Sequence, residues 1–278
     1  MPGDDPLARG EERFLLFGSG PAEAYHQRWF DSRLPGDGSV TYRILGSRLC
    51  GLAIAGPAAR DLLAGLTASD VSAQAFGFLD IRRIDVDMVP VLCARISFTG
   101  DLGYELWVDP GYQARLYDVL TRAGRDHGLR LFGAHALNSL RLEKSYGAWA
   151  TEYRPVYDPY EAGLGMFVKP DKGDFVGREA AEKVRTSGPA RRLVTFTVDA
   201  DDADVTGDEP IWHGSDVVGW VTSGGFAHTV GKSVALGYVP VELAGADEGF
   251  AVEVVGARRA AERLDACLFD PGGARMRS

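Results

Sequence analysis

Two carboxylates stand among the glycines of one short segment, Ser97–Leu106 (SFTGDLGYEL). Asp101 and Glu105 follow an apolar strand, and their spacing predicts that the carboxylates face a turn. A carboxylate shielded from water can accept two parallel N–H bonds from a guanidine-like edge, such as that of a pterin. Charge-assisted bonds of this kind stabilise by roughly 1.5–3 kcal/mol each. The residues alone leave two interpretations open, an anchor for such a ligand or a solvated turn.

A second group of polar residues lies in the segment LNSLRLEKSYGAWATEY. Helical spacing places Arg141 and Glu143 on different faces from the one that Leu137 and Leu140 share. Tyr146 follows where this predicted helix ends. From the residues alone, the simplest interpretation is a packed helix that carries a solvated ion pair.

The sequence lacks the residue patterns that other catalytic chemistries require. The five histidines show no close pairing, no serine or cysteine lies in a G-x-S-x-G motif, and the three cysteines have no C-x-x-C spacing. HTVGKS ends like a phosphate-binding loop, but Phe226 stands where that loop requires its first glycine. GSGPAEA, from Gly18, lacks the dinucleotide-binding spacing. We therefore expect neither a metal site nor a nucleotide site, and any oxidation step would belong to another polypeptide.

The elements that must position these residues indicate an α+β protein with two parts. Strands are predicted at 13–17, 39–45, 50–56, 82–88 and 90–98, and helices at 21–35, 57–66, 109–128 and 134–147. Short strands separated by Gly-rich turns follow and predict a small antiparallel barrel or sandwich. We place the boundary near Thr186, which gives an α+β part over residues 1–186 and a β part over 187–278.

Composition restricts the partners. The chain has 278 residues, a net charge of -9 and a pI near 5.1. This charge opposes binding to nucleic acid or to an anionic membrane, since both need a concentrated positive field. The sequence contains no apolar run of membrane-spanning length and no secretory signal pattern. We expect a cytoplasmic protein whose partners are a small molecule and other proteins.

The segment SFTGDLGYEL resembles the G-Y-T-G-E-x-G-[FYW]-E signature of the glycine-cleavage T-proteins and their dehydrogenase-fused relatives. The resemblance implies that Glu105 holds a pterin, with Asp101 nearby. Phe98 departs from the tyrosine that is usual at its position, so a hydroxyl group is lost there. The segment SLRLEKSY is similar to a second stretch of the same superfamily, which implies that Tyr146 contacts folate, beside Arg141.

Longer segments extend the resemblance toward the C-terminus. EAGLGMFVKPDKGDFVGREA, GWVTSGGFAHTVGKSVALGYV and FDPGGARMR are similar in order and spacing to the dimethylglycine and sarcosine dehydrogenase branch, and Leu137 replaces an arginine of the T-proteins proper. The resemblance implies a folate-binding aminomethyltransferase-like module, incomplete at its N-terminal part, followed by a β-barrel. It also implies a transferase with tetrahydrofolate as cofactor, which accepts a one-carbon unit from an N-methylated or aminomethyl substrate.

The front of the chain departs from that family pattern. The family's catalytic aspartate precedes the strand that corresponds to RFLLF, and here Asp4 or Asp5 is the candidate. The resemblance implies a module that is shortened at its N-terminal part, and we then expect a protein partner or an oligomer to complete it, because apolar faces and sheet edges are normally covered. Two alternatives stay open: a non-catalytic folate-binding or assembly subunit of a larger oxidase or demethylase, and a folate-independent enzyme on the same scaffold.

Overall fold

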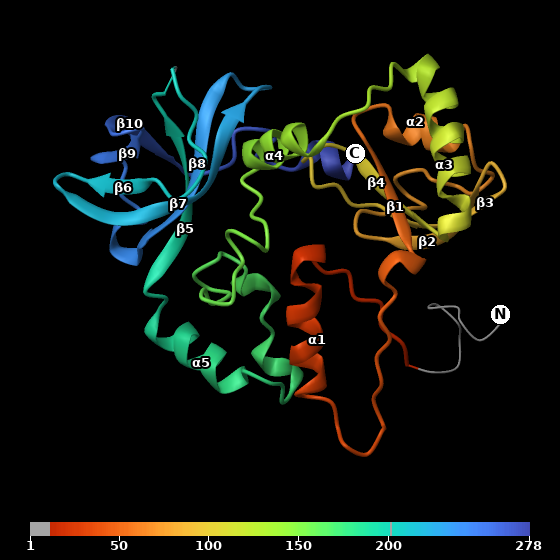
Figure 1. Ribbon diagram of the computed structural model, residues 1–278, viewed down its shortest axis with the longest axis horizontal. Helices are drawn as coiled ribbons and strands as arrows, with labels where there is room; N and C mark the ends of the chain where they lie inside the picture. Colours follow the sequence, from red (N-terminus) through yellow and green to blue (C-terminus); the bar gives the residue numbers. More distant parts are fainter. Residues whose placement is uncertain (1–11, 201) are drawn as a thin grey trace.

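The computed structural model describes residues 12–200 and 202–278, and Asp4 and Asp5 lie outside them. Figure 1 shows the small sheet with its helices at the right of the molecule and the barrel at the left. Helices α1 and α5 lie below both. The expected α+β part followed by an antiparallel barrel is confirmed.

The first part is built around a four-stranded antiparallel sheet in the order β1-β4-β3-β2. One face of this sheet packs on α2 and α3 through Tyr104, Leu106 and Leu116, which are fully buried. Helix α3 begins at Pro110 and is capped by the Asp109 carboxylate, which accepts the Gly111 N–H at 2.9 Å. The elements in chain order are η1 (Gly20–Ala22), α1 (Glu23–Asp31), η2 (Gly46–Arg48), β1 (Cys50–Ala55), α2 (Ala59–Ala64), β2 (Ile81–Val86), β3 (Val89–Ala94), β4 (Gly103–Val108), α3 (Pro110–Ala123), η3 (Gly124–His127) and α4 (Ala134–Glu143).

The second part is a closed six-stranded barrel in the order β10-β5-β8-β7-β6-β9. Its core includes Phe196, Ile211 and Val252, none of which has measurable exposure, and closure leaves no strand of the barrel with a free edge. The remaining elements are η4 (Gly165–Phe167), η5 (Pro170–Lys172), α5 (Arg178–Ser187), β5 (Arg191–Val198), β6 (Pro210–His213), β7 (Asp216–Ala227), β8 (Lys232–Pro240), η6 (Val241–Leu243), β9 (Phe250–Val254), β10 (Ala257–Leu264) and α6 (Ala274–Arg277).

Helix α4 joins the two parts. Leu142 packs on the barrel residues Val234 and Leu236, and the Ser139 hydroxyl donates to the Phe226 carbonyl at 2.7 Å. After the barrel, the chain returns to the first sheet, where α6 lies beside β4 (Figure 1).

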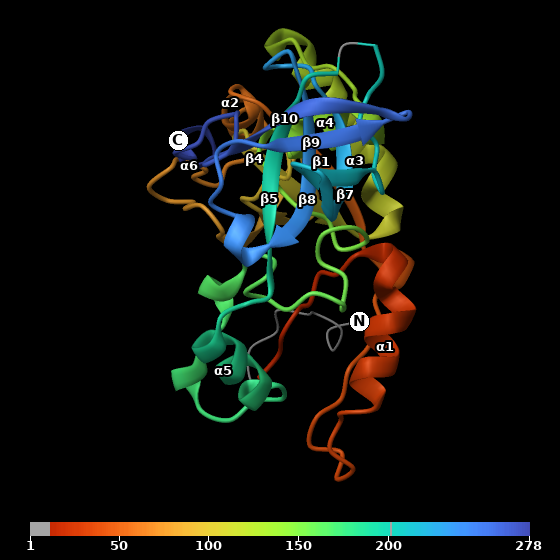
Figure 2. The same ribbon diagram turned by 90° about the vertical axis from the view of Figure 1, so that its left-hand side faces the viewer.

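The N-terminal segment differs from the sequence prediction. Residues 13–17 and 39–45 were expected to be strands, but neither forms a ladder with another strand. Several of their apolar side chains are largely exposed, with Phe14 79% and Leu16 73% exposed. Strand propensity expresses how well a side chain fits a half-buried sheet, and in the described part of the chain these segments have no sheet to join. Figure 2 shows α1 and its flanking segments extending below the body of the molecule.

The described residues contain no helix that is both long and apolar enough to cross a membrane.

Candidate functional site

Glu105 is the third residue of β4 and lies inside the sheet, so the expectation that its carboxylate faces a turn is wrong. It pairs with Ala53 on β1 and with Ala94 on β3. Because side chains alternate along a strand, Glu105 points to the face opposite the core residues Tyr104 and Leu106. Its two cross-strand neighbours on that face, Ala53 and Ala94, are small, and the bulky Trp107 lies two residues further along β4.

The Glu105 carboxyl group is half-buried and poorly satisfied. Burial raises the pKa of this carboxyl, and the Trp107 indole, two residues along the same face, opposes that rise more weakly. No hydrogen bond of normal geometry joins the two groups, since the buried Trp107 Nε1 has no partner among the described residues. An acceptor, the Glu105 carboxylate, and an unpartnered donor, the Trp107 N–H, therefore lie on one sheet face. Phe17 packs against the indole, with ring centroids 4.9 Å apart.

Phe98 and Tyr146 form an aromatic pair beside the turn that leads into β4. Their rings are nearly parallel, at 17°, with centroids 6.1 Å apart. The Tyr146 hydroxyl donates to the Met276 sulfur at 3.2 Å, and burial raises the pKa of this hydroxyl. The structure thus brings together two of the residues that the sequence nominated, and both present flat apolar rings.

Arg141 lies inside the protein and does not form a solvated ion pair with Glu143, as the simplest interpretation of the sequence had it. It is 4% exposed, and its Nη1 donates to the Tyr146 carbonyl at 3.0 Å and to the Glu152 carboxylate at 3.2 Å. Its Nε donates to Asn138 Oδ1 at 2.9 Å. Glu143 is buried as well and accepts the Thr229 N–H. The α4 faces that were expected to meet water instead meet the barrel and the loop that follows.

Asp101 lies in the turn before β4, where its carboxylate is already engaged. One oxygen accepts the Leu102 N–H at 2.9 Å and the other pairs with Arg275 at 3.2 Å. Its contacts are with the C-terminal segment, on which α6 lies, and Glu105 is the less satisfied of the two carboxylates.

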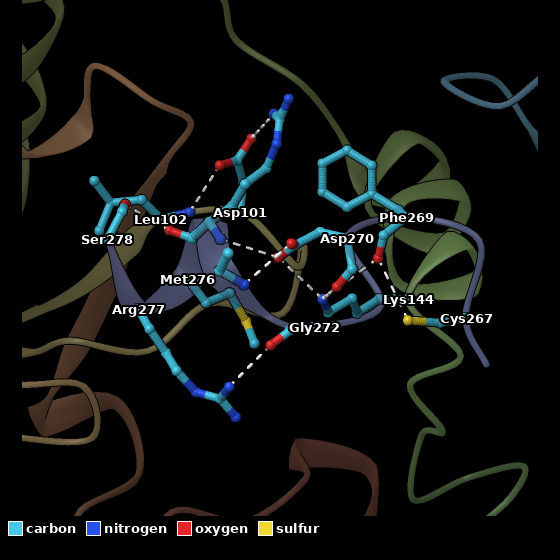
Figure 3. A network of polar contacts seen from close by, with 12 residues as sticks. Asp101, Leu102, Lys144, Cys267, Phe269, Asp270, Gly272, Met276, Arg277 and Ser278 are labelled. Carbon is cyan, nitrogen blue, oxygen red and sulfur yellow. Dashed lines mark hydrogen bonds and ion pairs between the residues drawn. The ribbon is translucent and has the colours of Figure 1, made fainter.

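Two buried cations, Lys144 and Arg95, hold the C-terminal segment against this region, and Figure 3 shows the contacts of Lys144. Lys144 donates to the Asp270 carbonyl at 2.5 Å, and the Asp270 carboxylate in turn accepts the N–H groups that begin α6. Arg95, only 1% exposed, donates to the Phe76 carbonyl at 2.6 Å and to the Ser278 carbonyl at 2.5 Å. These contacts place Met276 on Tyr146.

Sequence reasoning missed Glu152, Trp107 and Met276. Trp107 shares a strand face with Glu105, so a period-two pattern could have found it. Met276 lies 130 residues from Tyr146 in the chain, and no local pattern indicates that contact. Glu152 was part of a quoted segment, but its partners on β7 are 70 and 71 residues away.

Two cavities of about 340 and 450 Å³ lie beside the barrel, and neither is lined by Glu105 or Tyr146. The first is lined by His135, Asp204 and His228 among others. Within the described ranges, no cluster of three or more His, Cys, Asp or Glu side chains is arranged to hold a metal ion.

Family profiles match both parts of the chain. The profile described as "GCVT N-terminal domain" matches residues 7–172, and the one described as "Glycine cleavage T-protein C-terminal barrel domain" matches residues 191–270. The first match begins far upstream of the segments on which the sequence resemblance rested.

Individual proteins are similar over most of the chain. Human mitochondrial dimethylglycine dehydrogenase is 40% identical over 88% of this chain, which corresponds to 28% of that protein. An aminomethyltransferase of Symbiobacterium thermophilum is 37% identical over 73% of this chain and 54% of its own length. The chain thus spans under a third of the first relative and about half of the second.

A solved structure shows the same fold. The crystal structure of glycine cleavage system aminomethyltransferase T from Bartonella henselae superposes with a TM-score of 0.69 at 24% identity. The match covers 80% of this chain and 60% of that one.

Proposed function

The chain belongs to the glycine cleavage T-protein family, and from that membership we propose that it binds tetrahydrofolate and acts in one-carbon transfer from an N-methylated or aminomethyl donor. One observation supports this proposal above the others. Glu105 offers a half-buried carboxylate whose charged form only the Trp107 indole stabilises among the described residues. A shielded acceptor without a strong donor is what a pterin edge would complete.

The residues present fit a folate. Glu105 would accept the pterin N–H groups, and the buried Trp107 indole would lie beside it on the same sheet face. Phe98 and Tyr146 would give a flat apolar wall for a ring system. Bound tetrahydrofolate would supply the nitrogen that accepts the one-carbon unit. The protein's own contribution is to orient this nitrogen toward the donor and to exclude water from the reaction.

Titration calorimetry of the chain with tetrahydrofolate tests the proposal. We expect saturable binding of one ligand per chain. p-Aminobenzoylglutamate, which lacks the pterin, is the matched control, and we expect it to bind far more weakly. Equal affinity for the two compounds would contradict a pterin anchor at Glu105. Binding without turnover of any N-methylated amine would favour the alternative of a non-catalytic subunit.

We also propose that a second protein or another copy of this chain covers the N-terminal segment. Its apolar side chains are exposed, including Phe14, Leu16, Val40 and Ile44, and α1 buries none of its residues. Apolar groups gathered in one segment normally mark a contact surface. A stable contact of this kind buries on the order of 1,200 Å² in total or more.

Light scattering coupled to gel filtration tests the association, on the chain alone and after co-expression with neighbouring gene products. We expect a complex larger than one chain, in which Leu16→Asp reduces assembly. A strictly monomeric chain that binds tetrahydrofolate and turns over an N-methylated amine unaided would overturn the proposal.

A further inference from the structure

Glu152 occupies the point where α4, the loop after it and the barrel meet. Its carboxylate is completely buried. Oε2 accepts the Ala148 N–H at 2.8 Å, the Thr151 hydroxyl at 2.5 Å and Arg141 Nη1 at 3.2 Å. The side chain thus fixes its own loop to α4.

The other oxygen of Glu152 reaches the barrel. Oε1 accepts the hydroxyl groups of Thr222, at 2.5 Å, and of Ser223, both on β7. The Glu152 carbonyl accepts the Tyr238 hydroxyl of β8 at 2.8 Å. Burial alone would raise the pKa of this carboxyl, but the hydrogen bonds from Ser223, Thr151 and Thr222 hold it below its usual value. The group is therefore an ionised carboxylate.

The loop that Glu152 fixes carries the aromatic wall of the candidate site. Arg141 Nη1 contacts Glu152 and the Tyr146 carbonyl at the same time. Tyr146 then stacks on Phe98. A continuous series of polar contacts thus runs from β7 through Glu152 and Arg141 to the residue that faces the ligand.

We infer that Glu152 is a positioning residue, which sets Tyr146 relative to Glu105 by holding Arg141 between the barrel and the loop. The inference rests on the proposed folate site for its functional consequence, while its structural consequence is independent of any ligand. Without the carboxylate charge, the Arg141 guanidinium loses its counter-charge and its hold on the Tyr146 carbonyl weakens.

Glu152→Gln is a sharp test, because the amide has nearly the same shape. Its oxygen can accept from Arg141 and Ala148, while its NH₂ group faces the hydroxyls of Thr222 and Ser223, which can accept as well as donate. Folding is therefore compatible with the change, and what is lost is the charge opposite Arg141.

Glu161→Gln is the matched control. Glu161 is 5% exposed, pairs with Arg191 at 3.0 Å and accepts the Asp158 N–H at 3.1 Å. It joins the following loop to β5, and its carboxylate bonds to Asp158 and Arg191 do not involve Arg141 or Tyr146. The two variants remove the same charge from comparable depths.

Hydrogen exchange by mass spectrometry on the ligand-free chain gives the first readout. We expect Glu152→Gln to accelerate exchange in residues 144–153, and Glu161→Gln to leave that segment unchanged. The second readout is tetrahydrofolate affinity. It should fall roughly two- to thirty-fold in Glu152→Gln, which is the usual effect of residues that influence a binding site without touching the ligand. We expect no comparable fall in Glu161→Gln.

The two readouts separate the possible failures. If the parent chain binds no tetrahydrofolate, the proposed function fails, and the exchange measurement still decides the inference. Equal exchange in the two variants, or unchanged protection of 144–153 in Glu152→Gln, would overturn it. If Glu152→Gln does not fold, Ser223→Ala keeps the charge and removes one donor, and it should accelerate exchange in the same segment; no acceleration there would also overturn the inference.

Discussion

The loop around Glu152 and the sheet face around Glu105 each hold a shielded carboxylate, and their surroundings differ in one respect. Glu152 has a donor for each of its lone-pair directions, supplied by a hydroxyl, amide or guanidinium group. For Glu105, the Trp107 indole is the one group that favours the charged carboxylate among the described residues, and its effect is smaller than that of burial. A buried polar group left without a partner costs free energy unless something else completes it. The fold itself supplies the donors for Glu152 and does not do so for Glu105, so substitutions at the two sites should have different consequences.

The largest effect expected from this comparison is on stability. Glu152→Ala leaves Arg141 buried without its counter-charge, and we expect it to lower the free energy of unfolding by about 3–5 kcal/mol. Glu105→Ala strands no partner and should change it by about 0.5 kcal/mol or less. Urea unfolding of the ligand-free chain measures both. Equal losses would show that Glu105 is also a structural group.

The next effect is on binding. Glu105→Gln replaces one acceptor by a donor that faces the pterin N–H groups, and we expect tetrahydrofolate affinity to fall by roughly 2–4 kcal/mol. Glu179→Gln, at the exposed start of α5, is the control that changes the same charge elsewhere. Calorimetry measures the affinities. Equal tetrahydrofolate affinity in the parent and in both variants would rule out Glu105 as the residue that holds the pterin.

A smaller effect is expected at the aromatic pair. Phe98→Tyr restores the hydroxyl that is usual in the family, and we expect tetrahydrofolate affinity to rise by about 0.5–1.5 kcal/mol. Phe98 is partly exposed, so the added oxygen costs little to accommodate. A clear loss of affinity would mean that the site is shaped around phenylalanine, and it would favour a folate-independent enzyme.

The pH dependence should have opposite signs at the two carboxylates. The pKa of Glu105 is raised in the folded chain, so its contribution to stability is present below its usual value and is lost as pH rises through the raised value. The pKa of Glu152 is lowered, so its contribution is present above its usual value and is lost as pH falls through the lowered one. Urea unfolding across pH should therefore show the parent losing stability relative to Glu105→Gln toward neutral pH, and relative to Glu152→Gln toward acid pH. The same sign for both variants would contradict the comparison.

Local patterns predicted the elements whose stability is local or whose pairing partner is near in the chain. The helical spacing in residues 109–128 and 134–147 corresponds to α3 and α4, and the Gly-separated apolar runs after residue 190 correspond to barrel strands. Residues 13–17 have the same apolar character and form no strand, because a ladder needs a neighbour that no property of the segment reveals.

The candidate site was only partly accessible from sequence for a related reason. Glu105 and Tyr146 were nominated by resemblance, and the structure adds what each one contacts. The Asp101 and Arg141 side chains are engaged in ion pairs with Arg275 and Glu152, respectively, and these partners lie in other segments of the chain. Whether a charged side chain is free or engaged is a property of the folded neighbourhood, and single-sequence patterns do not contain it.

The contacts of the buried Arg95 also restrict the order in which parts of this protein can assemble during its synthesis on the ribosome. Its side chain lies beneath the first sheet, yet two of the carbonyls that accept its protons belong to residues 181 and 183 positions further along the chain. During synthesis, Arg95 has the Phe76 carbonyl as an acceptor but lacks the two later ones until the barrel has emerged and residues 274–278 have returned to the first sheet. Met276 reaches Tyr146 by the same return of the chain, so the contact between these two residues forms only on a chain whose barrel has already been made.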